Sequence, residues 1–313
     1  MITSSDNSSN FNRGDLIRGK WNGVRYRVER LLGQGSNGKV YLVYEGSRAR
    51  ALKFGFSAAE LQSEVNALKA ISAAEPKQES YLLDVDDAEL GGHRLPFYVM
   101  RFVEGERLHQ YLGAKGLDWF PLVAYNLLCK LGQLHRSGWI FGDLKADNVL
   151  VTGYGQVHLV DYGGATLQGK SVKQFTEIYD RGYWRGGERL ADEGYDLFSF
   201  AVLWLQMMQK ESLEAQASKL LPQNRTTEWL IQQLRTNRRL SPYEPSLTRM
   251  INGKAYSTRE ECAAWQRLLR GSANHPDERF VSGNQTMSGT AVKGMFAVSV
   301  MLLCGAVYMV WQQ

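Results

Sequence analysis

Hydrophobic and polar residues alternate along the first third of the chain, as they do in half-buried strands. Apolar residues next recur every three or four positions over 58–73, which predicts a helix, and a short apolar run at 97–103 returns to strand. The predicted elements are strands at 26–32, 39–45, 49–54 and 97–103, and helices at 58–73, 122–136, 195–210 and 259–270. We therefore expect an α+β protein with a strand-rich first part and a mainly helical remainder.

An uncharged apolar run, Gly294–Trp311, lies near the last residue. As a helix, its 18 residues would span roughly 27 Å, near the ~30 Å hydrocarbon thickness of a membrane. A buried core helix is the alternative, but the run has no polar face, and Tyr308 and Trp311 lie where an interfacial aromatic belt would be. Because Lys293 precedes the run, we expect a single-pass C-terminal anchor in the cell membrane, with the rest of the chain in the cytoplasm.

The composition is that of a globular protein. The 313 residues are 44% hydrophobic and 22% charged with 7 Pro, which excludes collagen-like and disordered classes. Cys129, Cys262 and Cys304 show no CxxC or Cys/His ligand spacing, so we expect neither a disulfide scaffold nor a structural zinc site. The first 12 residues have neither a basic nor an apolar region, so we expect no cleaved secretory signal.

The formal charge of +5 comes entirely from the C-terminal part. Residues 1–208 carry 24 Lys and Arg against 24 Asp and Glu, whereas 209–313 carry 13 against 8. Solvated helix faces explain such an excess, and so does attraction to DNA or to an anionic lipid surface. The arginines of this basic region are Arg235, Arg238, Arg239, Arg249, Arg259, Arg267 and Arg270.

The first chemical signal is the glycine-rich run GQGSNGKV at Gly33–Val40, between two predicted strands. Glycines let backbone N–H groups approach phosphates closely, because a side chain would block the approach or the positive φ. A dinucleotide-binding fingerprint would need a helix directly after the glycines, whereas the following residues predict a strand. A plain hairpin loop is the alternative to a triphosphate-binding loop.

Lys53 ends the sequence Ala51-Leu52-Lys53 on the next predicted strand, where its ammonium group can meet phosphate oxygens. A lone strand lysine is more often only solvated, so a phosphate-binding lysine needs an acidic partner that orients it. Glu64 lies on the predicted helix that follows, with Glu60 one turn earlier as the competitor. We favour Glu64.

The second cluster, WIFGDLKADNVLV, covers 139–151 between a predicted helix and an apolar strand. The carboxylate of Asp143, the cation of Lys145 and the amide of Asn148 suit a loop that accepts a hydroxyl proton, neutralises phosphate charge and holds a metal. Asp161 ends a further predicted strand, and its carboxylate suits Mg²⁺. Each Asp alone would more often be a turn residue or a helix cap.

In this order, the motifs resemble those of the eukaryotic-type (Hanks-type) protein kinases over about residues 26–280. The resemblance implies a bilobal kinase fold, ATP and Mg²⁺ as cofactors, and transfer of the γ-phosphoryl group to Ser or Thr of protein substrates. It implies these roles: Asp143 as catalytic base, Lys145 as γ-phosphate contact, Asn148 and Asp161 as magnesium ligands, and Lys53 with Glu64 as the ATP-orienting pair. The implied nucleotide contacts are Gly33, Gln34, Gly35, Gly38, Val40, Ala51, Lys53, Met100 as gatekeeper, and Phe102 in the hinge.

Three phrases, GKWNG, WIFGDLK and YDRGYW, narrow the resemblance to the tail-anchored, sporulation-associated kinases of endospore-forming Gram-positive bacteria. This likeness implies autophosphorylation, assisted by dimerisation, in sporulation or stress signalling. The expected organisation is a flexible segment at 1–20, an N-lobe at 21–103, a C-lobe at 104–280, a linker at 281–293 and the anchor at 294–311.

Several positions depart from the kinase pattern. The usual His-Arg-Asp is Phe141-Gly142-Asp143, so the arginine that would grip a phosphate on Thr166, Ser171 or Thr176 is missing. The threonine that Ser/Thr kinases place against the catalytic loop corresponds to Arg181, which leaves Ser/Thr versus Tyr preference open.

The resemblance further implies that Asp196 caps the backbone around the catalytic loop and that Glu188 in the activation segment pairs with Arg279. These residues favour a protein kinase over its rivals. The main alternative is a small-molecule phosphotransferase like the aminoglycoside and choline kinases, which also carry Gly-Asp-Leu without the arginine. A non-catalytic membrane scaffold is disfavoured, because all the motif residues for catalysis are present.

Overall fold

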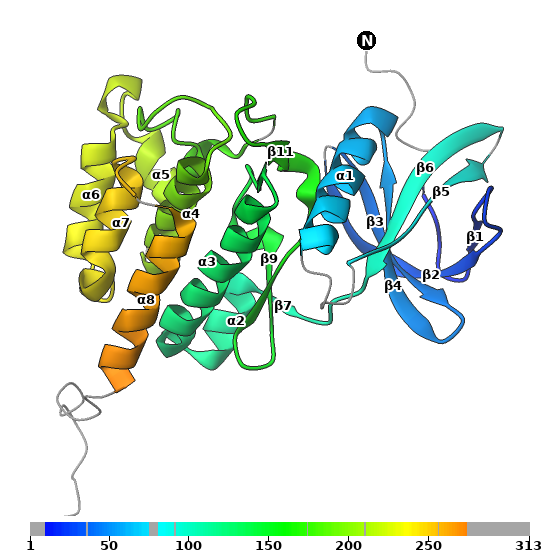
Figure 1. Cartoon of the computed structure of the whole chain (residues 1–313), viewed down its shortest axis with the longest axis horizontal. Coiled ribbons are helices and arrows are strands. Elements are labelled where there is room, and N and C mark those ends of the chain that lie inside the picture. Colours follow the sequence, from blue (N-terminus) through cyan, green and yellow to red (C-terminus); the bar gives the residue numbers. More distant parts are fainter. Residues whose placement is uncertain are drawn as a thin grey trace, which may run out of the picture. The chain divides into compact units, whose positions relative to one another are not determined.

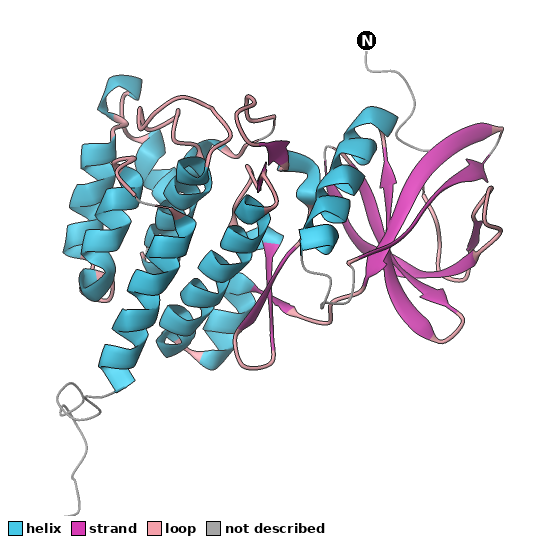
Figure 2. Cartoon of the chain, in the orientation of Figure 1, coloured by secondary structure: helices cyan, strands magenta, loops and turns pink. Residues whose placement is uncertain are grey.

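The computed structural model of the protein describes residues 10–273, apart from 36, 75–80, 91, 174, 210 and 256. Strands dominate its first part and helices the rest (Figures 1 and 2), so the predicted α+β class is confirmed. The predicted linker and anchor, 281–311, lie outside the described residues, and so does Arg279. Within the described ranges, none of the helices combines the length and apolar character that crossing a membrane requires.

The first layer is a six-stranded antiparallel sheet with the order β1-β2-β3-β4-β6-β5. Its strands are β1 Leu16–Arg18, β2 Arg25–Gly35, β3 Gly38–Glu45, β4 Arg48–Gly55, β5 Leu82–Leu90 and β6 His93–Arg101. One face buries an apolar cluster that includes Val28, Val43, Leu52 and Phe97. Helix α1, Ala58–Ala74, packs on the sheet (Figure 2), because its Leu61, Val65 and Leu68 share one buried face.

Two of these strands were not predicted. β1 is only three residues long, and β5 has the sequence LLDVDDAEL, whose acidic residues are rare in strands. The structure explains the carboxylates of β5: Asp86 accepts hydrogen bonds from the backbone N–H groups of Trp21 and Asn22, and Asp84 accepts one from the Tyr26 hydroxyl. These contacts join the GKWNG turn to the edge of the sheet.

The remaining part is helical. Its helices are α2 Leu108–Lys115, α3 Phe120–Arg136, α4 Glu193–Met208, α5 Leu213–Ser218, α6 Thr227–Thr236, α7 Glu244–Ile251 and α8 Thr258–Ala273. Helix α4 is buried nearly all round, as its largely apolar sequence requires. An aromatic cluster of Phe120, Phe200, Trp204, Tyr243 and Trp265 joins α3, α4 and α8 to the turn directly before α7.

Two small sheets position the chemically important loops. β8, Trp139–Ile140, pairs with β11, Thr166–Leu167, and β9, Val149–Thr152, lies between β10, Gln156–Leu159, and β7, Glu106–Arg107. Asp143 therefore follows β8, and Asp161 follows β10. Because strands fix both ends of each short loop, the two carboxylates are presented by rigid backbone.

Candidate active site

Lys53 is the centre of an ion cluster. From β4, its Nζ lies 2.9 and 2.7 Å from the two carboxylate oxygens of Glu64 on α1, and 2.8 Å from Asp161 Oδ1. Lys53 and Glu64 are 3% and 1% exposed, so this pair is sealed from water. Glu60, the competing partner, is exposed. The structure thus brings together a strand, a helix and the segment after β10 at one ammonium group.

The charges of this cluster are fixed by their neighbours. Burial alone would lower the pKa of Lys53, but the carboxylates of Asp161 and Glu64 outweigh burial and raise that pKa above its ordinary value. Burial would likewise raise the pKa of Asp161, but Lys53 holds it below the usual range. At neutral pH the cluster therefore contains a protonated lysine and an ionised Asp161.

Tyr98 is a member of this cluster that sequence analysis missed. Its fully buried hydroxyl donates a 2.7 Å hydrogen bond to Glu64 Oε2. Tyr98 lies on β6 directly opposite Lys53 of β4, so both side chains stand on the same face of the sheet. A signal did exist, because Tyr98 precedes the predicted gatekeeper Met100 by two positions and strand alternation puts both on one face.

The predicted nucleotide contacts lie around Lys53 on this face. Val40 is opposite Lys53 on β3, and Ala51, two residues before Lys53, is opposite Met100 on β6. Cross-strand partners share a face, so these side chains form one continuous patch. Phe102 follows the end of β6.

The glycine run forms the hairpin between β2 and β3, with Gly35 opposite Gly38. A Cβ on Gly38 would lie 1.9 Å from the Phe54 carbonyl oxygen, so the packing of the sheet itself demands glycine there. In contrast, a Cβ on Gly33 or Gly35 would meet no atom of the protein within 4 Å. Packing within the protein therefore requires glycine at position 38 and leaves open space at positions 33 and 35.

The loop after β8 holds Asp143 in a dense set of hydrogen bonds. Lys145 Nζ lies 2.7 Å from Asp143 Oδ2, and Asn148 Nδ2 donates to the Asp143 backbone carbonyl at 2.8 Å. Asp143 is buried, although Lys145 is partly exposed. The base, the cation and the amide of the predicted loop are thus gathered at one place.

Thr176 corrects one sequence assignment. Its hydroxyl donates to Asp143 Oδ1 at 2.8 Å and lies 3.2 Å from Lys145 Nζ. The threonine against the catalytic loop is therefore Thr176, and the assignment of this position to Arg181 was wrong. Arg181 instead forms a two-bond ion pair with Asp192, at 2.8 Å for each contact. Sequence counting failed because the segment is irregular and has no periodicity to fix its register.

The catalytic loop rests on Asp196 of α4, as predicted. This fully buried carboxylate accepts hydrogen bonds from the backbone N–H groups of Phe141 and Gly142, at 2.7 and 2.9 Å, and contacts His135 Nε2 at 2.8 Å. Gly142 has a φ of +79°, and a Cβ there would lie 2.6 Å from the Gly164 carbonyl oxygen. This backbone therefore favours glycine where related loops carry arginine.

The activation segment is held by its own side chains. Glu188 is exposed, and the buried carboxylate of the segment is Asp180, which pairs with Arg189 at 2.7 Å and accepts a hydrogen bond from the Tyr195 hydroxyl. The predicted partner of Glu188 lies outside the described residues.

Comparisons with known proteins agree with this geometry. A family model described as a protein kinase domain matches residues 26–273. The serine/threonine-protein kinase YabT of Bacillus subtilis is 37% identical over 251 residues, which cover 79% of this chain and 72% of that protein. The probable serine/threonine-protein kinase SCO3848 of Streptomyces coelicolor is 28% identical over 165 residues, which cover 50% of this chain and 24% of that protein.

Among solved structures, the ROP18 kinase domain in complex with AMP-PNP and sucrose aligns with a TM-score of 0.58. The alignment covers 85% of this chain and 87% of the ROP18 chain, with 16% sequence identity, so this likeness supports the fold alone.

A β-rich lobe and a helical lobe with a lysine and two aspartates between them define a phosphotransferase of the kinase fold. The match over most of its length shows that the chain belongs to the protein kinase family. The resemblance to bacterial Hanks-type kinases is confirmed, and the names of the relatives support a serine/threonine protein kinase. The small-molecule phosphotransferase is not favoured.

Tyr98→Phe tests the fourth member of the lysine cluster. Loss of one hydrogen bond to Glu64 costs about 1 kcal/mol, so we expect kcat/KM for ATP to fall about fivefold. Steady-state kinetics at varied ATP concentration measure it. Tyr111→Phe is the matched control, because this buried hydroxyl donates to the Gly153 carbonyl outside the cluster. Equal kinetics for the two variants would contradict the role of Tyr98.

Proposed function

We propose that this protein transfers the γ-phosphoryl group of ATP to serine and threonine hydroxyls of proteins, its own chain included. The observation that carries this proposal is the assembled pair of clusters, with Lys53 between Glu64 and Asp161, and Asp143 between Lys145 and Thr176. Lys53, Glu64 and Asp143 are buried in these clusters. An imperfectly paired buried charge costs several kcal/mol, so their close pairing supports a role in phosphoryl transfer.

The residues present fit a nucleotide. Val40, Ala51 and Met100 offer an apolar patch for a base, next to the ammonium group of Lys53. Gly33 and Gly35 leave room above the hairpin for phosphates to contact backbone N–H groups. Lys53, oriented by Glu64, would contact the phosphate oxygens.

The residues also fit Mg²⁺. Asp161 supplies a carboxylate that is 45% exposed. Asn148 donates through its Nδ2 to Asp143, so its amide oxygen is the atom that would bind the ion. Carboxylate and amide oxygens are the hard ligands that Mg²⁺ prefers. When bound, the ion would neutralise charge on the phosphates.

In the mechanism, Asp143 accepts the proton of the substrate hydroxyl as that oxygen attacks the γ-phosphorus. Lys145, held 2.7 Å from Asp143, stabilises the negative charge that develops on the transferred group. Most of the rate enhancement comes from positioning, because the protein forms no covalent bond with the phosphoryl group.

Thr176 supports serine and threonine as acceptors. Its hydroxyl occupies the corner between Asp143 and Lys145, so it holds the substrate-binding segment against the catalytic loop. The position that the sequence assigned to Arg181 thus holds a threonine, as in serine/threonine kinases, which supports serine and threonine as acceptors.

We infer that catalysis does not require phosphorylation of the activation segment. The Lys53–Glu64 pair is formed without any phosphate, and Gly142 has no side chain to grip one. The segment is ordered instead by the Asp180–Arg189 pair.

Asp143→Ala should lower phosphorylation by about 10²–10⁴-fold, because the proton acceptor is lost. ATP affinity should stay nearly unchanged. Transfer from γ-labelled ATP with Mg²⁺ to the chain and to a generic protein measures the first, and calorimetry the second. Asp147→Ala is the control on the same loop, since Asp147 is exposed and pairs with Arg107, away from Asp143. Label on added small alcohols alone would instead support a small-molecule phosphotransferase.

Thr176→Val keeps the shape of the side chain but removes its hydroxyl, leaving Asp143 and Lys145 short of one partner. We expect kcat to fall about 10- to 100-fold, for a loss of about 1–3 kcal/mol, whereas Thr176→Ser should retain activity. Mass spectrometry of the products should find phosphoserine and phosphothreonine. Full activity of Thr176→Val, or phosphotyrosine as the main product, would contradict the proposal.

We further propose that the basic C-terminal region binds DNA or an anionic lipid surface. Two of its arginines are already paired, Arg235 with Glu244 and Arg249 with Glu261. Arg238 and Arg239, in the exposed turn after α6, are better candidates, as is Arg259 at the start of α8.

Charge reversal tests this surface. The double variant Arg238→Glu/Arg239→Glu should weaken binding to duplex DNA or to acidic vesicles. For DNA, the slope of log affinity against log salt concentration should become shallower by about two. Arg18→Glu/Arg48→Glu, which reverses two exposed charges on β1 and β4, is the control. Binding of neither ligand at low salt by the unchanged protein would refute the idea. The tail anchor, dimerisation and a role in sporulation stay predictions from the sequence.

A further inference from the structure

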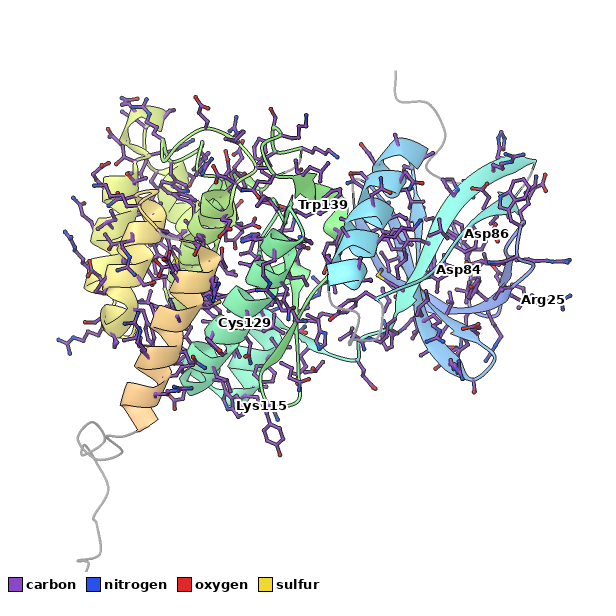
Figure 3. The ribbon with its side chains drawn as sticks, viewed as in Figure 1. Arg25, Asp84, Asp86, Lys115, Cys129 and Trp139 are labelled. Atoms are coloured by element: carbon purple, nitrogen blue, oxygen red, sulfur yellow. The ribbon has the colours of Figure 1, made fainter. Side chains whose placement is uncertain are left out.

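Two cysteines from distant parts of the sequence meet between two helices. Cys129 lies on α3 (Figure 3) and Cys262 on α8, both are half-buried free thiols, and the two side chains are within hydrogen-bonding reach of each other. Cys262 also packs against the main apolar core. Neither residue has a part in the phosphotransfer chemistry described above.

The backbone around these thiols is fixed by a neighbouring contact. His135 Nδ1 of α3 lies 2.7 Å from the Thr258 hydroxyl of α8, and both side chains are buried. Gly132 lies in the same region, where an added Cβ would be 3.5 Å from Thr258 Cγ2. Residues 129, 132 and 135 fall on one face of α3, and 258 and 262 on one face of α8. The contact between His135 and Thr258 therefore holds α3 and α8 together close to the two thiols.

The surroundings activate one of the two thiols. The hydrogen bond from Cys262 outweighs burial and, with support from Tyr125 and from the positive charges of Arg136 and Lys130, lowers the pKa of Cys129 to about 6. The same contact raises the pKa of Cys262. A cysteine with a pKa below neutral is largely thiolate, the nucleophilic form. The other charged groups that act on this site are Arg270 and Glu261.

A metal site does not explain the pair. Structural metal sites in proteins use three or four ligands, and the described part of the chain contains no group of three or more His, Cys, Asp or Glu residues placed to hold a metal ion. Two thiols in contact, one of them activated, are suited to oxidation.

We propose that Cys129 and Cys262 form a peroxide-sensitive pair that closes into an intramolecular disulfide and fastens α8 to α3. The Cys129 thiolate attacks one oxygen of hydrogen peroxide, the O–O bond breaks, and hydroxide leaves and is protonated to water. The Cys262 sulfur then attacks the Cys129 sulfenic acid; its S–H proton and the departing hydroxyl form a second water as the S–S bond forms. Two thiols lose two electrons in total, and the peroxide gains them.

The disulfide would lock the support of the catalytic loop. His135 lies six residues after Cys129 on α3 and contacts Asp196, and Asp196 holds the backbone of Phe141 and Gly142. A bond between α3 and α8 closes a long loop of chain, which restricts the unfolded state. We expect oxidation to raise the melting temperature by about 5–10 °C.

The test uses the full chain in detergent with Cys304→Ser, so that only two cysteines remain. After treatment with hydrogen peroxide and alkylation, mass spectrometry should find a Cys129–Cys262 linked peptide and no alkylation of either residue. Melting should occur at the higher temperature, and a thiol reductant should restore both properties. Cys129→Ser and Cys262→Ser, each added to Cys304→Ser, are matched controls that should show no gain in melting temperature on oxidation.

Three outcomes would overturn the proposal: both thiols still alkylated after peroxide treatment, Cys129 converted to sulfinic acid without a link, or a link between two chains. The peptide map of the parent protein decides among these outcomes even if a serine variant folds poorly.

Discussion

The Nζ atom of Lys53 lies between two carboxylates that come from different elements, Glu64 of α1 and Asp161 after β10. Burying an ammonium group is costly unless good geometry and further hydrogen bonds compensate, so the three elements must stay in register for the cluster to be tolerated. Tyr98 donates a second hydrogen bond to Glu64 Oε2, an oxygen that Lys53 also contacts. The β-rich part and the Asp161 segment of the helical part are thereby joined at the point where a nucleotide would bind.

Unusual backbone conformations complete the arrangement. Asp161 has a φ of +62°, in the left-handed region that non-glycine residues seldom occupy, and Gly142 has a φ of +79°. The first aims a carboxylate at Lys53, and the second lets the catalytic loop contact Gly164. Glycine at position 142 also lacks the side chain that would anchor an activating phosphate, and the activation segment carries a pair between the buried carboxylate of Asp180 and the exposed Arg189. These features agree with the proposal that catalysis does not require a phosphate on the activation segment.

Sequence patterns predicted most of this structure where the signal was local. Helical periodicity predicted α1, and strand alternation predicted β3 and β4. Glu60 and Glu64 lie four residues apart on one side of α1, so periodicity could not choose between them, and the contact with Lys53 identifies Glu64. Contacts between residues far apart in the sequence were harder to predict. Tyr98 was missed because its partner Glu64 is 34 residues away, and Thr176 was missed because it lies in an irregular segment without periodicity. Strand β5 was missed because its carboxylates bind the GKWNG turn, a tertiary role that composition does not indicate.

The central claim is that Lys53, Asp143, Asn148 and Asp161 act on one nucleotide and its metal ion. Calorimetric titration of ATP into the full chain, with and without Mg²⁺, tests it most directly when the unchanged protein is compared with Asp161→Asn. The account predicts that Mg²⁺ strengthens nucleotide binding by the unchanged protein and that Asp161→Asn loses this strengthening while still binding ATP. No heat of binding to the unchanged protein, or an equal effect of Mg²⁺ on both proteins, would contradict it.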